Sequence, residues 1–175
     1  QRIDISLLDA LVHAQAAGLG SYLVTGDETP RTGNRSLYFA PSGIYGTKDG
    51  KSVVITCPSE RFFEKLCNAL DVDWVRDPRF ENIERRLENE DALDVAIEKR
   101  CKSFDSDELL ERLTAADVLS APLNGVGDVV ADPQILHNQM IVTTEHEKLG
   151  PVSVTGVPIH FAGTPASVRQ PPPLQ

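Results

Sequence analysis

The segment of this chain that is best suited to holding a ligand is the stretch of residues 30–45. It combines glycines, which leave the backbone free to approach a bound molecule, with hydrogen-bond donors and the positive charges of Arg31 and Arg35. Such a segment can bind an anionic or thioester group through its backbone N–H groups. The same composition is typical of an interdomain linker, and the residues alone favour neither interpretation.

The candidate metal ligands and nucleophiles are too dispersed to predict a catalytic site. No two histidines have the spacing of a zinc or iron motif, so no metal site is predicted. The cysteines are odd in number, match no zinc or redox motif, and are interpreted as reduced core thiols. These residues are His13, His137, His146 and His160, with Cys57, Cys67 and Cys101.

The acidic residues predict no nucleophile or general acid either. Many of them lie between residues 81 and 94 together with Arg85 and Arg86, and this charge-dense stretch is interpreted as the solvated face of a helix. No acid stands isolated in apolar surroundings, where its pKa would be tuned for catalysis. The sequence also contains no glycine-rich phosphate cradle. No catalytic residue is therefore predicted within this chain.

The overall charge limits the classes of partner. The 175 residues carry a formal net charge of -9. Binding to a nucleic-acid backbone requires a basic surface, so no nucleic-acid partner is expected. No apolar run approaches the length of about 18 residues that a membrane-spanning helix needs, and no signal peptide is recognisable. Together with the reduced thiols, these features predict a cytoplasmic protein without a membrane partner.

Hydrophobic spacing predicts an α+β fold, with a small antiparallel sheet, several helices and long extended arms at both ends. A first helix is expected over residues 4–23, with capping oxygens from Asp4 and Ser6, and a long loop over residues 25–43. Asp49-Gly50 lies between two apolar runs and predicts a β-hairpin.

The remaining elements follow from caps, prolines and apolar periodicity. Helices are expected after Ser59 and Asn89, and after Asp105, where Glu108 would complete a capping box. Shorter elements are expected as a strand near residues 118–124, helical turns over 126–131 and from Pro133 to Leu136, strands over 140–145 and 152–155, and an irregular arm over 156–175.

An ordered set of short phrases resembles the C-terminal part of the family III CoA-transferases of the CaiB/BaiF type. This family includes formyl-CoA and carnitine CoA-transferases and the α-methylacyl-CoA racemases. Each phrase is common by chance, and the resemblance rests on their order and spacing. The phrases include Asp4 to Leu11, Arg31 to Asn34, Tyr45 to Gly50, Phe62 with Leu66-Cys67, Asp77 to Phe80, Ala121 to Asn124, Asp128-Val129, Asp132 to Gln134, His146, Gly156 to Ile159 and Thr164-Pro165.

The resemblance implies an interlocked homodimer whose subunits each contain a Rossmann-like large domain and a small α+β domain. For this chain it implies a helix and linker of the large domain over residues 1–36, the small domain over 37–145, and an arm returning to the large domain over 146–175. It also implies a group of residues near the substrate, in the loop at the start of the small domain. These are Gly33, Asn34, Ala40, Pro41, Ser42, Gly43 and Tyr45.

The implied reaction moves CoA from an acyl-CoA donor to an acceptor carboxylate, with the CoA thioester as substrate and no tightly bound cofactor. In the family an aspartate attacks the thioester, and an acyl anhydride and then an aspartyl-CoA thioester form. That aspartate precedes the helix that begins near Asp4, so it is expected upstream of this chain, and the isolated chain is expected to be inactive.

Two alternatives remain beside an acyl-CoA transferase: a racemase-type relative, and a non-catalytic module that assembles a dimer. Racemase members tend to carry an acid directly after the tyrosine of the Tyr45 phrase. This chain has Gly46 there, which favours a transferase. The loop also lacks the run of consecutive glycines of the formyl-CoA transferases, which argues against an oxalate or formate substrate.

Overall fold

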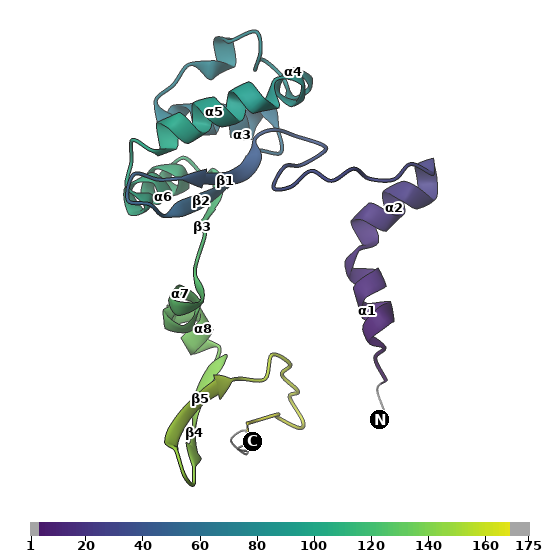
Figure 1. Ribbon diagram of the computed structural model, residues 1–175, viewed down its shortest axis with the longest axis vertical. Coiled ribbons are helices and arrows are strands. Elements are labelled where there is room, and N and C mark those ends of the chain that lie inside the picture. The colour runs from purple at the N-terminus through teal and green to yellow at the C-terminus, as the bar shows by residue number, and fades with distance from the viewer. Residues whose placement is uncertain (1–3, 169–175) are drawn as a thin grey trace. The chain divides into compact units, whose positions relative to one another are not determined.

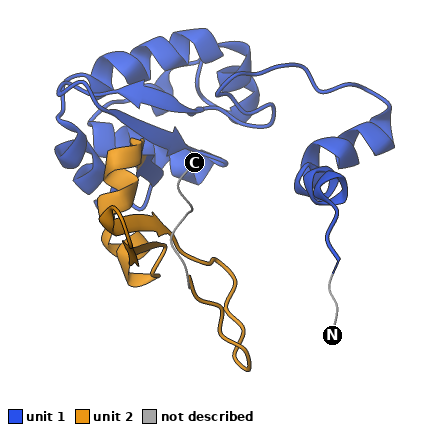
Figure 2. Ribbon diagram, turned by 60° about the horizontal axis from the view of Figure 1, so that its bottom comes forward, with its two compact units in different colours: residues 1–121 blue, residues 122–175 orange. Residues whose placement is uncertain are grey.

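The computed structural model describes residues 4–168 of the chain. It divides into two compact units, residues 1–121 and residues 122–175 (Figure 2). In chain order the elements are α1 (Leu7–Ala14), α2 (Ala16–Thr25), β1 (Ser42–Gly46), β2 (Ser52–Thr56), α3 (Glu60–Leu70), the 3-10 turn η1 (Trp74–Arg76), α4 (Ile83–Glu88), α5 (Glu90–Cys101), α6 (Ser106–Ala115), β3 (Leu119–Pro122), α7 (Val126–Ala131), α8 (Pro133–His137), β4 (Ile141–His146) and β5 (Gly150–Thr155) (Figure 1). The predicted α+β class is confirmed.

The first unit is built around a three-stranded sheet in the order β1-β2-β3. β1 and β2 form the hairpin that Asp49-Gly50 predicts, and Gly50 has a φ of 80°, a backbone conformation that glycine adopts without strain. The sheet and helices α3, α5 and α6 share one hydrophobic core. Core positions on the two strands alternate with more exposed ones, as the two-residue period of a strand requires; Tyr45, Val53 and Ile55 are the buried ones.

The three cysteines lie in this core as free thiols, as predicted. Burial raises the pKa of Cys57 to about 12, that of Cys67 to about 11 and that of Cys101 to about 12. A thiol must lose its proton to act as a nucleophile or metal ligand. These cysteines therefore contribute packing rather than chemistry.

A buried arginine corrects the interpretation of residues 81–94 as a solvated face. Arg86 has no exposed surface and stacks over the ring of Phe63, with 4.2 Å from the guanidinium carbon to the ring centroid. Its Nε donates to the carbonyl oxygen of Ala40 at 2.7 Å, and Nη1 donates to the carbonyl oxygen of Phe80 at 3.0 Å and to Glu60 at 2.8 Å. Arg86 thus joins α3, α4 and the chain entering β1 through one planar group.

The hairpin turn provides the cap of α6. The expected capping box of Asp105 and Glu108 is wrong, because the side chain of Asp105 makes no capping hydrogen bond. The Asp49 carboxylate accepts instead from the backbone N–H of Ser106 at 3.2 Å and from the Ser106 hydroxyl at 2.8 Å. Asp49 also accepts from the hydroxyl of Thr47. A carboxylate from another part of the chain satisfies the helix start and places the hairpin against α6.

This cap predicts a pH-dependent contribution to stability. The hydrogen bonds from Thr47 and Ser106 lower the pKa of Asp49 below its ordinary value. A carboxylate with a depressed pKa stabilises the folded state above its unfolded pKa of about 4, and this contribution is lost as pH falls through the folded value. We expect Asp49→Asn to have a lower free energy of unfolding than wild type at pH 7, and the difference between the two to close below about pH 4. Urea unfolding across this pH range would show a constant gap if the expectation is wrong.

The single helix expected over residues 4–23 is two helices, α1 and α2, separated at Gln15. Ser6 caps α1 as predicted, accepting from the backbone N–H of Asp9 at 3.3 Å. Neither helix has a buried residue, and large apolar side chains are exposed on both. The most exposed are Leu7, Leu8, Leu11, Leu23 and Val24.

The second unit contains α7, α8 and the β4–β5 hairpin, close to the predicted positions. The carboxylate of Asp132 accepts from the backbone N–H groups of Gln134 and Ile135, so the Asp-Pro phrase caps α8. At the end of β5, the N–H of Gly156 donates to the carbonyl oxygen of Met140 at 2.8 Å. From residue 156 to residue 168 the chain has no regular element, as expected for an arm rich in glycine and proline. Residues 169–175 of the expected arm lie outside the described part.

Within residues 4–168, no helix is both long and apolar enough to cross a bilayer. The predicted division into a helix and linker of the large domain (residues 1–36), the small domain (37–145) and a returning arm (146–175) stays a prediction.

Candidate functional site

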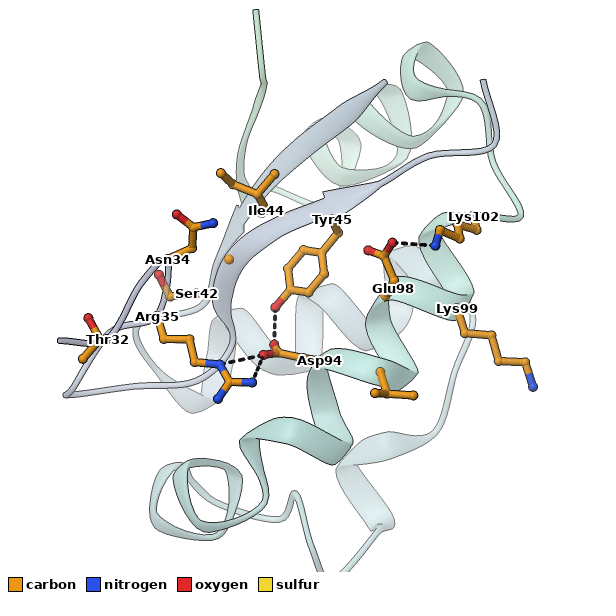
Figure 3. Close-up of a pocket in the computed structure, with 12 residues that line it drawn as sticks. Thr32, Asn34, Arg35, Ser42, Ile44, Tyr45, Asp94, Glu98, Lys99 and Lys102 are labelled. Atoms are coloured by element: carbon orange, nitrogen blue, oxygen red, sulfur yellow. Dashed lines mark hydrogen bonds and ion pairs between the residues drawn. The ribbon is translucent and has the colours of Figure 1, made fainter. Parts of the chain in front are cut away.

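An open cavity of about 640 Å³ lies between the loop of residues 32–35, strand β1 and helix α5 (Figure 3). The loop side is polar and α5 contributes both acids and bases. The residues lining it are Thr32, Asn34, Arg35, Ser42, Gly43, Ile44, Tyr45, Asp94, Val95, Glu98, Lys99 and Lys102.

Four of the seven expected substrate-binding residues line this cavity: Asn34, Ser42, Gly43 and Tyr45. The other three do not. Gly33 lies beside the lining residues with a φ of 64° and lets the loop turn. Ala40 and Pro41 are buried beneath the start of β1 and serve packing. Whether any of the seven contacts a substrate stays a prediction.

Asp94 joins the loop to the strand. One carboxylate oxygen accepts from the Tyr45 hydroxyl at 2.8 Å, and the other accepts from the Arg35 Nε at 2.9 Å (Figure 3). Arg35 also donates to Asp91 at 2.7 Å. Burial and the charge of Asp94 raise the pKa of Tyr45, so its hydroxyl stays a neutral donor. The hydrogen bonds to Asp91 and Asp94 raise the pKa of Arg35, which keeps its charge.

Gly43 leaves room for the Tyr45 ring. A Cβ on Gly43 would lie 3.0 Å from the Tyr45 hydroxyl oxygen and 3.1 Å from the ring carbon that carries it. A side chain there would fit only if the Tyr45 ring moved by a few tenths of an ångström. The absence of a side chain at residue 43 is thus part of what holds Tyr45 in place.

Glu98 closes the other end of the cavity wall. Its carboxylate accepts from the backbone N–H of Gly46 at 2.8 Å and forms an ion pair with Lys102 at 2.8 Å. Partial burial opposes ionisation, but the Lys102 and Gly46 hydrogen bonds outweigh it and lower the pKa of Glu98. Both acids of the cavity are therefore already engaged by donors. Within the described part of the chain, no cluster of histidine, cysteine or acidic side chains could hold a metal ion.

The sequence interpretation missed the contribution of α5. Asp94 was assigned to a solvated face, whereas it is partly buried between Arg35 and Tyr45. One feature of the sequence could have predicted this wall: Asp94, Glu98 and Lys102 follow each other at four-residue steps. This spacing places all three side chains on one helix face.

Arg35 is expected to hold the loop against α5. Arg35→Ala should increase amide hydrogen exchange over residues 31–36 while lowering global stability by about 1 kcal/mol or less, because the ion pairs are partly solvent-exposed. Arg79→Ala is the matched control, since Arg79 pairs with Asp77 in an exposed loop far along the chain. Exchange-detected mass spectrometry measures both. Equal exchange of residues 31–36 in wild type and Arg35→Ala would contradict the expectation.

Comparison with known proteins places this chain in a family. The whole chain, residues 1–175, matches the model of CoA-transferase family III. The chain belongs to CoA-transferase family III. The match confirms the resemblance carried by the ordered phrases.

Individual relatives of family III agree. The chain is 27% identical over 173 residues to a human succinyl-CoA:glutarate CoA-transferase, covering 98% of this chain and 39% of that protein. It is 30% identical over 162 residues to an acetyl-CoA:oxalate CoA-transferase of Acetobacter aceti, covering 92% of this chain and 40% of that protein. A crystal structure of a CaiB/BaiF family protein from Brucella suis matches 94% of this chain and 42% of that one, with a TM-score of 0.77 and 31% identity. The chain spans less than half the length of these relatives.

Proposed function

We propose that this chain forms the small-domain part of an acyl-CoA:carboxylate CoA-transferase. The observation that carries the proposal is the family III match over all 175 residues, together with relatives that are named as CoA-transferases. The substrates are an acyl-CoA thioester and a carboxylate acceptor, and CoA moves between acids through an aspartyl-CoA intermediate. No tightly bound cofactor takes part, and the location is cytoplasmic.

The nucleophilic aspartate is proposed to lie outside this chain. Among residues 4–168, the acids that line the cavity are Asp94 and Glu98. Asp94 is held by Arg35 and Tyr45, and Glu98 by Gly46 and Lys102. Attack on a thioester would require either carboxylate to give up these donors, which lower its nucleophilicity. The cavity is therefore suited to binding, and the attacking group must come from elsewhere in the enzyme.

A transferase is favoured over a racemase by the surroundings of Gly46. A Cβ at this residue would lie 3.1 Å from the Glu98 Oε1 atom. An acidic side chain, as expected of racemase members at this place, would bring a second negative charge beside Glu98 and would be repelled.

We also propose that the enzyme is a homodimer, as the resemblance to family III implies. The exposed apolar residues Leu7, Leu8 and Leu11 of α1 offer surface for such an assembly.

The test measures CoA transfer directly. The 175-residue chain is incubated with succinyl-CoA and glutarate, or with acetyl-CoA and oxalate, and the new thioester is quantified by mass spectrometry. We expect no transfer by this chain alone, and transfer by the gene product that includes the coding region upstream of Gln1.

Two results would contradict this proposal. Transfer by the 175-residue chain would show that its nucleophile lies within the chain. A longer product that transfers no CoA, but exchanges the α-proton of a 2-methylacyl-CoA with deuterium, would be a racemase.

A further inference from the structure

Within residues 4–168 no strand pairs with the outer edge of β1, and the hydrogen-bonding pattern shows which of its groups are free. β1 is an edge strand, because the sheet order is β1-β2-β3. The N–H of Thr47 donates to the carbonyl of Lys51, and the N–H of Cys57 donates to the carbonyl of Pro41. In an antiparallel pair, hydrogen-bonded and non-hydrogen-bonded residues alternate. Residues 41, 43, 45 and 47 therefore bond to β2, and residues 42, 44 and 46 direct their N–H and C=O groups away from it.

Ser42 and Ile44 carry the free N–H and C=O pairs of this edge beside the cavity, and Ile44 is the one in the middle of the strand. Of the outward-pointing N–H groups, that of Gly46 is taken by Glu98 at 2.8 Å. Neither the N–H nor the C=O of Ile44 has a hydrogen-bond partner within residues 4–168. Ser42, Gly43, Ile44 and Tyr45 all line the cavity. The cavity is thus bordered by a backbone donor and acceptor on the same residue, the arrangement with which a strand pairs with another amide chain.

The helical wall complements a long ligand that is apolar in the middle and anionic at one end. Val95 of α5 is 70% exposed and lines the cavity beside the Ile44 edge. Lys99 follows Val95 one turn further along α5. Lys102 comes directly after the last residue of α5 and lies at the Gly46 end of β1, where a Cβ on Gly46 would be 3.6 Å from its Cε, and it pairs with Glu98 at 2.8 Å. Asn34 and Arg35 border the opposite end, since Arg35 binds Asp94 near Tyr45 (Figure 3).

We propose that the outer edge of β1 binds the pantetheine arm of the acyl-CoA substrate. This inference rests on the proposed function, which supplies the CoA thioester. Pantetheine contains two secondary amides, and one of them can accept from the Ile44 N–H and donate to the Ile44 C=O. The CoA phosphates extend toward Lys99 and Lys102, and the thioester end extends toward the loop of Asn34. An extended peptide has the same amide chemistry, but Lys99, which has no ion pair within residues 4–168, favours a ligand that carries phosphates.

The first test follows single backbone amides of the 175-residue chain by NMR and hydrogen exchange. The probes are pantetheine, CoA, adenosine 3′,5′-bisphosphate and the capped peptide acetyl-Ala-Ala-N-methylamide. We expect pantetheine and CoA to shift the Ile44 N–H resonance and slow its exchange. The N–H groups of Gly43 and Tyr45, which bond to β2, should not change. The bisphosphate, which has no secondary amide, should leave Ile44 unprotected.

A variant pair isolates the donor. Ile44→Pro removes the outward N–H without touching the bonds to β2, and an edge strand tolerates proline at such a position. Ile44→Val keeps the N–H and is the matched control. We expect pantetheine to bind Ile44→Pro about 3- to 10-fold more weakly than Ile44→Val, the effect of one lost hydrogen bond. Unchanged exchange of the Tyr45 amide would confirm that the hairpin of the variant has kept its pairing. The protection experiment on the unsubstituted chain does not depend on how the variant folds.

Three results would overturn the proposal. One is the absence of Ile44 protection at saturating CoA, and another is equal pantetheine affinity in the two variants. The third is protection by the capped peptide at lower concentration than by CoA, which would make this edge a peptide-docking site. CoA transfer is measured independently, so an active transferase without Ile44 protection would refute this inference and leave the proposed function standing.

Discussion

Replacing Arg86 with methionine is expected to lower the free energy of unfolding by about 2–5 kcal/mol. The carbonyl oxygens of Ala40 and Phe80 would lose their donor in the interior, because Arg86 itself has no exposed surface. A buried acceptor without a donor carries the full cost of its desolvation. Methionine fills much of the volume, so the loss reports the hydrogen bonds more than a cavity. Denaturant unfolding followed by circular dichroism gives the change.

Arg85 offers a matched control one residue earlier. Its side chain is 54% exposed and forms a surface ion pair with Glu88 at 2.8 Å. We expect Arg85→Met to change the free energy of unfolding far less than Arg86→Met, because exposed ion pairs contribute little to stability. Arg86→Lys separates charge from geometry, because an ammonium keeps the charge but cannot reproduce the planar fork that reaches Ala40, Phe80 and Glu60. Equal losses in Arg85→Met and Arg86→Met would contradict the role assigned to the buried guanidinium.

Gly156→Ala is expected to open the β4–β5 hairpin from the α8 side. A Cβ at this residue would lie 2.0 Å from the carbonyl oxygen of Gln139, which is backbone and cannot rotate away. The backbone must shift, and the hydrogen bond from the Gly156 N–H to Met140 would be lost. We expect a local destabilisation of about 3 kcal/mol, the upper end of the usual cost of overpacking. No described residue of the second unit is fully buried, so little packing opposes this opening.

Amide exchange of the hairpin measures this effect. The N–H groups that pair β4 with β5 should exchange faster in Gly156→Ala than in wild type. Gly163→Ala is the control in the same unit, since a Cβ there would meet no atom within 4 Å. If both variants exchange at the wild-type rate, the close approach of Gly156 to Gln139 does not constrain the hairpin.

The sequence predicted those elements whose causes are local. Asp49-Gly50 forms the hairpin turn, Ser6 caps α1, and Pro133 begins α8 after the Asp132 cap. In each case the deciding contacts lie within a few residues of each other. The order of the short phrases was equally decisive for the family, since the whole chain matches CoA-transferase family III.

The cavity was only partly predictable. The loop and the start of β1 were expected to contribute, and Asn34, Ser42, Gly43 and Tyr45 do line it. The α5 wall was not expected, because the charges of Asp94 and Glu98 in sequence are indistinguishable from those of a solvated helix. Their partners, Tyr45 and Gly46, are about fifty residues away in the chain.

Patterns along the chain were thus enough to predict the α+β class, the positions of most elements and the family. The surroundings of the charged groups became known only from the folded molecule. Arg86 is buried because two carbonyls and Glu60 surround its guanidinium, while the identical neighbouring residue Arg85 faces solvent. Asp49 caps α6 because the hairpin brings it to Ser106. A local pattern specifies backbone conformation, whereas the partner of a charged side chain depends on which distant segments the core brings together.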